Sequence, residues 1–417
     1  MGRILELAEK LWMGAVRADD HPPYAPLLEL EPLADGVAFV SSFANVTAIR
    51  SDEGLVLFDV GSAPLGAQVF GSVRDWSKDR VHTAVFTHGH LDHVMGIGRF
   101  DDEAKDKGWA APRVVAHEAV PARFERYALT AGYNGCINTR QFQMPVTWPT
   151  SFRAPDVLYS VEMRMHVGGV GIELHHARGE TDDHTWAWVP SKKLLCTGDL
   201  FMWCCPNAGN PQKVQRYPRD WARALRAMAA LGAEILSPGH GVPIVGADRV
   251  NLALSETAEL LEHLHDQTVA AMNQGLRLDE VLRVVRAPER LLERPYLNPV
   301  YDEPEFIVRN VWRLYGGWWD GDPSHLKPAP PEQLATEIAR LAGGAKVLAD
   351  RATALVGAGD LALACHLAEL AAQAAPDDAG IRKARADVYH LRARRERSLM
   401  ARGVYAAAAS EPPPRKA

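Results

Sequence analysis

The sequence has few cysteines, no long apolar run and no large excess of one charge. Its five cysteines form an odd, scattered set without a C-x-x-C spacing, which argues against a disulfide framework and a sulfur-only zinc site. No segment approaches the roughly 18 apolar residues of a membrane span, and Glu6 and Glu9 interrupt the apolar core that a signal peptide needs. The 46 basic and 52 acidic residues leave a net charge of -6, which offers nucleic acid no attraction. We therefore expect a cytoplasmic protein without a membrane span or a nucleic-acid partner.

The 417 residues are enough for two or three domains. The first half alternates short β-branched strands with helical stretches, which indicates an α/β fold with helices outside the sheets. Beyond about residue 250 the chain is rich in Ala, Leu and Arg at helical spacing, and Asp360 and Asp377 are expected to cap helices there. We predict a catalytic domain over 1–250, an all-α domain over 251–410 and a disordered tail over 411–417. The first domain should contain strands near these ranges: 36–43, 45–51, 54–61, 82–88, 113–119, 163–177 and 185–199.

The strongest chemical signal is the segment TAVFTHGHLDHVMG, residues 83–96. An apolar strand ends at Thr87 and is followed by three imidazoles and a carboxylate within six positions: His88, His90, Asp92 and His93. Such a donor set suits a borderline cation such as zinc. A polar loop that binds no metal is the alternative, and four ligand-type groups directly after a buried strand argue against it.

Six residues are too few to surround two metal ions, so further ligands should follow later strands. Asp199 comes after the apolar LLC, and His240 comes after AEIL. With these residues, the chain from about Gly36 to Val245 resembles the metallo-β-lactamase superfamily. The resemblance implies an αββα sandwich that holds two metals. His88 and His90 would bind the first, Asp92, His93 and His240 the second, and Asp199 would bridge them, while Asp59 would orient a ligand histidine.

One ligand of the first metal departs from the usual pattern. Most of the superfamily supplies it as His in a G-H-T turn, and the corresponding turn here is Gly179-Glu180-Thr181, within RGETDDHTW. A carboxylate oxygen also binds zinc, and the exchange adds one negative charge that makes Mn or Fe more competitive. Asp182 and Asp183 are expected to be hydrated or to support the ligands from behind.

Glu at this position narrows the resemblance to the alkylsulfatases of the superfamily. Residues 296–331 and the helices that follow resemble the alkylsulfatase dimerisation domain, including its G-W-x-D-G-x-P signature at Gly317–Pro323. The resemblance implies a homodimer and a small anionic ester as substrate. Two features depart from the family: Asp199 replaces the usual bridging Glu, and no counterpart of the sterol-carrier-like domain follows.

Several residues are weaker candidates for the substrate and for proton transfer. Residues 132–142 resemble a segment that lines the alkylsulfatase pocket, which makes Asn138 and Arg140 candidates for binding the ester. Lys213, Arg216 and Arg219 lie where the family places anion-binding residues, and Arg216 is favoured because a guanidinium matches an oxyanion in a bidentate way. The remaining candidates are Tyr301 for substrate binding and Asp92 and His184 for catalysis, with His184 either a proton donor or a support for a ligand.

The sequence therefore predicts a hydrolase with two Zn²⁺ ions per chain, or Mn or Fe, that cleaves alkyl or aryl sulfate esters with a hydroxide shared between the metals. A hydrolase of lactones, carboxylic esters, thioesters or phosphate esters is the first alternative, favoured by Asp199 and by the absent third domain. A non-catalytic helical scaffold is the second, and a redox di-iron protein is a minor one.

Overall fold

The protein is described by a computed structural model that covers residues 2–410, so the predicted disordered tail lies outside the described residues. The chain forms two compact units. One consists of Met1–Ala131 and Pro149–Gly317, and the other of Gly132–Trp148 and Trp318–Ala417. The larger unit thus extends past the predicted boundary at residue 250. The internal segment Gly132–Trp148 belongs to the smaller unit.

The first sheet of the larger unit has seven strands in sequence order. Its neighbours are antiparallel from β1 to β4 and parallel from β4 to β7. The strands are β1 (Leu30–Ala34), β2 (Val37–Val40), β3 (Val46–Ser51), β4 (Gly54–Phe58), β5 (Val81–Val85), β6 (Arg113–His117) and β7 (Val157–Tyr159).

The second sheet has six strands in the order β13-β12-β11-β10-β9-β8. Only the β11–β12 pair is parallel among them. The expected strand ranges 163–177 and 185–199 each form an antiparallel hairpin, and the first turns at Gly168–Gly169. The strands are β8 (Glu162–Val167), β9 (Val170–His176), β10 (Thr185–Val189), β11 (Leu194–Met202), β12 (Ile235–His240) and β13 (Ile244–Val245).

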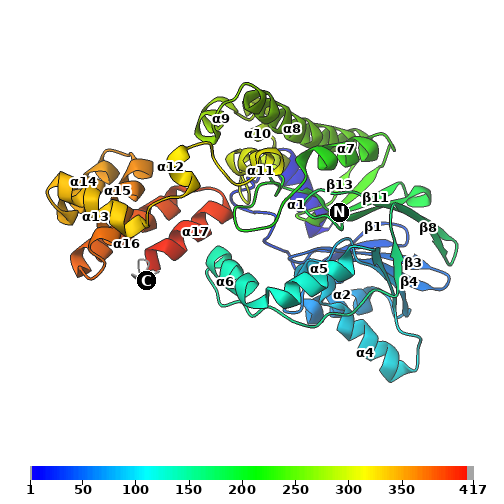
Figure 1. Cartoon of the computed structure of the whole chain (residues 1–417). Coiled ribbons are helices and arrows are strands. Elements are labelled where there is room, and N and C mark those ends of the chain that lie inside the picture. Colours follow the sequence, from blue (N-terminus) through cyan, green and yellow to red (C-terminus); the bar gives the residue numbers. More distant parts are fainter. Residues whose placement is uncertain (1, 411–417) are drawn as a thin grey trace. The chain divides into compact units, whose positions relative to one another are not determined.

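The two sheets pack face to face with helices on both outer sides (Figure 1). Side chains such as Ile49 and Val85 of the first sheet meet Ile172 and Leu174 of the second in a dry core between them. The outer face of the first sheet is covered by α2 (Gly66–Trp76), α4 (Ile97–Lys107) and α5 (Val120–Leu129). The second sheet is covered by α7 (Pro218–Ala229) and α8 (Ala247–Asn273). The expected αββα sandwich is therefore present.

The long helix α8 explains why the larger unit extends past residue 250. Its Leu254 and Leu261 are fully buried in the same apolar cluster as Trp221 and Leu225 of α7. The other helices of this unit are α1 (Arg3–Trp12), α3 (Leu91–Val94), α9 (Leu278–Val284), α10 (Glu289–Leu292) and α11 (Pro304–Gly316), with short 3₁₀ turns at Pro190–Lys192 and Pro295–Leu297.

The smaller unit is helical, as the composition of the second half indicates. Small Ala and Leu side chains form its apolar clusters. Asp360 accepts a hydrogen bond from the Leu363 amide and caps α15 as predicted, whereas α16 is capped by Asp378 rather than Asp377 because the helix begins one residue later. The helices are α6 (Ala131–Phe142), α12 (Pro323–Leu326), α13 (Pro331–Ala342), α14 (Ala345–Gly357), α15 (Leu361–Ala374), α16 (Ala379–Arg395) and α17 (Leu399–Ser410). No helix within residues 2–410 combines the length and the apolar character needed to cross a bilayer.

Gly96 allows the segment after β5 to lie against the end of β4. Its amide donates to the Gly61 carbonyl, the Val60 amide donates to the His93 carbonyl, and a Cβ at position 96 would overlap the Val60 carbonyl oxygen. We expect Gly96→Ala to displace this backbone and to destabilise the protein by about 1–3 kcal/mol, the usual cost of overpacking. Thermal unfolding measures the change.

Gly98→Ala is the matched control, because a Cβ at this exposed helical position meets no atom within 4 Å. Its stability should stay the same or rise by up to about 1 kcal/mol, since Ala favours a helix over Gly. Equal unfolding temperatures for the two variants would contradict the steric role of Gly96.

Candidate metal centre

The H-x-H-x-D-H residues lie where β5 passes into a short helix. His88 and His90 belong to the loop after Val85, and Asp92 and His93 belong to α3. The His93 amide donates to the His90 carbonyl at 3.1 Å, which closes the first turn of this helix. The spacing of the motif therefore presents four donor groups at the carboxyl end of a buried parallel strand, where α/β proteins place their ligands.

The second sheet contributes the other three predicted ligands. Glu180 lies in the loop between β9 and β10, Asp199 lies within β11, and His240 ends β12. Asp199 was expected just past its strand, but β11 continues to Met202 with an irregular register against β12 after Gly198. The two sheets thus bring together all seven residues.

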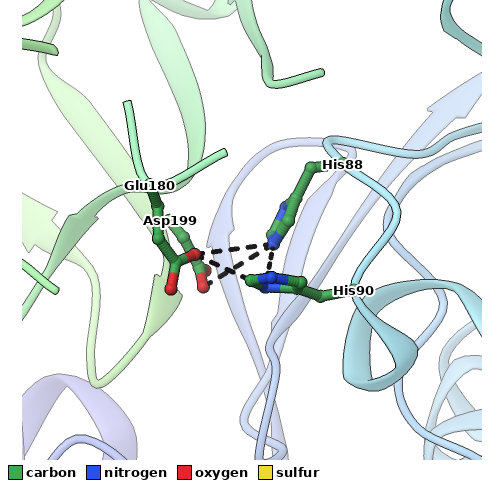
Figure 2. Close-up of side chains that lie close together, drawn as sticks. All are labelled: His88, His90, Glu180 and Asp199. Carbon is green, nitrogen blue, oxygen red and sulfur yellow. Dashed lines mark hydrogen bonds and ion pairs between the residues drawn. The ribbon is translucent and has the colours of Figure 1, made fainter. Parts of the chain in front are cut away.

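The first group consists of His88, His90, Glu180 and Asp199, whose donor atoms lie within 4.8 Å of one another. Figure 2 shows the two rings and the two carboxylates pointing toward a common point from opposite sheets. Glu180 Oε2 is 3.7 Å from His88 Nε2 and 3.5 Å from His90 Nδ1, and Asp199 Oδ2 is 3.8 Å from His88 Nε2. The two ring nitrogens are 2.8 Å apart.

The second group consists of Asp92, His93 and His240. Asp92 Oδ2 is 3.7 Å from His93 Nε2 and 3.5 Å from His240 Nε2. Asp199 also faces this group, because its Oδ1 is 3.3 Å from His93 Nε2 and its Oδ2 is 3.2 Å from His240 Nε2. Asp199 is the only one of these carboxylates that lies within 4 Å of histidines from both groups, which is the position of a bridging ligand.

Two features of the donor atoms fit bound metal ions: the distances between them, and the lack of hydrogen-bond partners for several of them. In a tetrahedral zinc site, bonds of about 2.0–2.2 Å place neighbouring donors about 3.3–3.6 Å apart, close to most distances here. His93 Nε2, Glu180 Oε2 and Asp199 Oδ1 are buried and have no hydrogen-bond partner within the described chain. Leaving such atoms unsatisfied is costly, and one cation in each group would satisfy all three.

The protonation states favour the same interpretation. Burial lowers the pKa of His88 and of His90 well below the usual value, so both rings are neutral near pH 7 and can donate lone pairs. Burial opposes ionisation of Asp199, but His240 and His93 outweigh it and hold its pKa well below the usual range. Burial raises the pKa of Glu180 to about 7, against the lowering effect of Arg216. Burial opposes protonation of His93 and His240, but Asp199 outweighs it and raises the pKa of His93 well above its usual value and that of His240 to about 9. Without metal the pocket thus contains neutral rings at His88 and His90, and protonated rings at His93 and His240 next to the ionised Asp199, so bound cations would replace positive charge that is already there.

Asp59, the residue expected to orient a ligand histidine, contacts His93 and Thr87. Its Oδ2 lies 2.7 Å from His93 Nδ1 and accepts from the Thr87 hydroxyl at 2.8 Å, while Oδ1 accepts from the Thr87 amide. Asp59 is held at φ +59°, a conformation that is uncommon outside glycine. Its carboxylate therefore fixes both the ring of His93 and the backbone next to His88.

His184 contacts the backbone of the bridging residue. Its Nε2 accepts a hydrogen bond of 3.0 Å from the Asp199 amide, and its ring stacks on His88. Burial lowers the pKa of His184 to about 4, so the ring is neutral at pH 7. These contacts favour support of the ligands over proton donation. Its predicted catalytic role stays a prediction.

The two acids between Glu180 and His184 differ in burial. Asp183 is buried, accepts the Gly89 amide at 3.0 Å and pairs with Arg123 at 2.6 Å, whereas Asp182 is half-exposed and pairs with the same guanidinium. Asp183 therefore ties the His88–His90 loop to the Glu180 loop. Arg123 was not singled out from the sequence, because nothing in the pattern of α5 distinguishes it from a surface arginine.

The contacts of Arg216 and Asn207 were also missed. The Arg216 guanidinium donates to Glu180 Oε1 at 2.6 Å, and the Asn207 amide donates to the same oxygen at 2.5 Å. Arg216 was predicted to bind the substrate, which stays a prediction. No sequence signal connected Asn207 with Glu180.

The remaining substrate candidates are placed in different parts of the chain. Asn138 and Arg140 belong to α6 in the smaller unit. Tyr301 is partly buried in the larger unit, beside Met202 and Cys204, with its ring 5.8 Å from that of Tyr24. A role in substrate binding stays a prediction for all three.

Two family matches cover most of the chain. Residues 41–240 match the metallo-beta-lactamase superfamily, and residues 277–412 match the alkyl sulfatase dimerisation region. The first contains all seven residues of the two groups, and the second begins near α9 and includes the helices of residues 318–410.

Curated relatives and solved structures agree with these matches. The chain is 27% identical to a linear primary-alkylsulfatase from Pseudomonas sp. (strain ATCC 19151) over 75% of its length, and 26% identical to an (R)-specific secondary-alkylsulfatase from Pseudomonas sp. over 88%. It spans only 62% and 60% of those two proteins.

The fold matches that of the stereoselective inverting sec-alkylsulfatase Pisa1 from Pseudomonas sp. The TM-score is 0.81 at 23% identity, over 91% of this chain and 65% of that one. The chain therefore belongs to the metallo-beta-lactamase superfamily and combines its αββα domain with an alkyl sulfatase dimerisation region.

Proposed function

We propose that the protein is a metal-dependent hydrolase of alkyl or aryl sulfate esters that uses two Zn²⁺ ions per chain, with Mn or Fe as alternatives. The observation that carries this proposal is Glu180. It offers a buried carboxylate oxygen to His88 and His90, at the position where most of the superfamily uses histidine. The alkylsulfatases among the relatives support the choice of substrate.

The side chains have separate tasks in this mechanism. A bound metal pair would neutralise the ester oxygens and lower the pKa of a water molecule toward neutrality. Asp199 would bind at both metal positions and fix the distance between them, and Asp59 would fix the ring of His93. Asp92 has a side chain that is 24% exposed, against 2% and 3% for Glu180 and Asp199, so it is the carboxylate that can accept a proton from entering water.

A substrate panel tests the proposed activity. The metal-loaded protein should release sulfate from short alkyl or aryl sulfates faster than it cleaves p-nitrophenyl esters or phosphodiesters. Ion chromatography of sulfate and absorbance of p-nitrophenol measure the two rates. The proposal fails if no sulfate is released from any member of the panel.

A different ester class is the second candidate, because Asp199 is shorter than the Glu that usually bridges the metals in alkylsulfatases. Faster cleavage of a lactone, carboxylic ester, thioester or phosphate ester would favour it. A non-catalytic scaffold would require less than about one metal equivalent per chain together with no hydrolysis.

Lys213 is a stronger candidate than Arg216 for the anionic part of the substrate. Burial and the charge of Arg216 lower its pKa to about 8, and the carboxylates of Glu180 and Asp92 act in the opposite direction.

We expect Lys213→Gln to raise KM for a sulfate ester by about 10- to 100-fold, the equivalent of one charge-assisted hydrogen bond. Steady-state kinetics measures KM and kcat. Arg219→Gln is the control, because Arg219 is an exposed cation on α7 that lines a surface pocket with Arg178 and Tyr217. A similar KM for both variants would remove Lys213 from the substrate site.

We also propose that the protein is a homodimer in the cytoplasm. The match of residues 277–412 to the dimerisation region supports the dimer, and the five free thiols suit a reducing compartment. Sedimentation equilibrium should give a mass of about twice the 45.8 kDa of one chain. A single-chain mass at every concentration would contradict the dimer.

A further inference from the structure

The two oxygens of the Glu180 carboxylate lie in different surroundings. Oε1 accepts two hydrogen bonds, from Arg216 Nη1 at 2.6 Å and from Asn207 Nδ2 at 2.5 Å. Oε2 faces His88 and His90 and has no hydrogen-bond partner among residues 2–410. One oxygen is thus held by the protein and the other is left for the candidate metal position.

The donors on Oε1 are themselves held rigidly. Arg216 is 2% exposed, and its Nη1 also donates to the Asn207 carbonyl, so Glu180, Asn207 and Arg216 form a closed cluster. We call these three residues the Glu180 clamp. The amide of Asn310, on α11, donates to the Arg216 carbonyl at 2.9 Å, and Asp302 accepts the Gly209 amide at 2.7 Å beside the Asn207 loop. These two contacts hold the backbone at Arg216 and next to Asn207, and the Arg216 guanidinium cannot leave Glu180 without also losing its bond to the Asn207 carbonyl.

The clamp has two physical consequences for a metal ligand. A carboxylate with two free oxygens can bind an ion through either oxygen or through both. In Glu180, Oε1 already accepts a charge-assisted hydrogen bond, so only Oε2 remains for a metal ion. The buried guanidinium also offsets the negative charge that Glu adds where a neutral imidazole usually lies. The Glu180–Arg216 pair therefore has the net charge of a single neutral histidine.

We propose that Arg216 and Asn207 are positioning residues that make Glu180 a one-oxygen metal ligand and that Glu180 and Arg216 function as an inseparable pair. This inference rests on the proposed role of Glu180 as a ligand. It predicts that exchanging Glu180 alone is more damaging than exchanging both members of the pair. In the single variant a buried guanidinium remains without its anion, next to bound cations.

The test is a double-mutant cycle read out as zinc affinity. Zinc dissociation constants of the full-length protein are measured by competition with a chromophoric chelator, for wild type, Glu180→His, Arg216→Met and the double variant. We expect Glu180→His to weaken the first site by about 100-fold, the upper end for changes around a metal ligand. The double variant should bind zinc at least about tenfold more tightly than Glu180→His.

Thermal unfolding of the metal-free proteins shows whether Glu180→His is folded. If it is not, the cycle is repeated with Glu180→Gln in its place. Arg74→Met is the matched control, because Arg74 is also a buried arginine but donates to Ser77 and Asp79 and pairs with Glu103. It should lower stability and leave zinc affinity unchanged.

The outcomes separate this inference from the proposed function. Additive effects of the two substitutions on zinc affinity would overturn the pairing of Glu180 with Arg216. Unchanged zinc affinity in both Glu180 variants would instead show that Glu180 is no ligand, and the proposed metal centre would fail with it. A gain of at least tenfold in the double variant, with no such gain when Arg74→Met is combined with Glu180→His, would support the clamp.

Discussion

The Asp199 carboxylate is the group on which the arrangement of this site depends. It is buried between two sheets and lies within 4 Å of His88 and His93, from the segment after β5, and of His240, at the end of β12. A buried carboxylate is stable only when positive charge or hydrogen-bond donors surround it. The sandwich meets this requirement by directing the ends of β5, β11 and β12 to one point. His184, Asp59 and the Glu180 clamp then hold the surrounding groups in place.

The metal-ligand candidates were accessible from the sequence because their signal is local. A run of four donor groups after an apolar strand, and single Asp or His residues after two later strands, can be recognised without knowing which strands are neighbours. The resemblance to the superfamily then identified Glu180 in the place of a histidine, and this glutamate narrowed the resemblance to alkylsulfatases. Short β-branched strands alternating with helical stretches indicated an α/β fold, and the resemblance to the superfamily then implied the αββα sandwich.

The supporting contacts could not be predicted, because they join segments that only the folded chain brings together. Arg123 reaches Asp183 across 60 residues, and Arg216 reaches Glu180 across 36. No period or motif distinguishes these arginines from those on the surface, so their bonds to Asp183 and Glu180 were not expected. The packing of α8 on α7 could not be predicted for a similar reason, since the sequence of α8 resembles that of any amphipathic helix.

The central claim is that Glu180 and Asp199 hold a pair of metal ions together with the histidines of the two groups. A crystal structure of the zinc-loaded protein, with anomalous data collected at the zinc edge, tests it most directly. The account predicts two anomalous peaks, one bounded by His88, His90, Glu180 Oε2 and Asp199, and one bounded by Asp92, His93, Asp199 and His240. A single peak, or a Glu180 carboxylate turned away from the first, would contradict it.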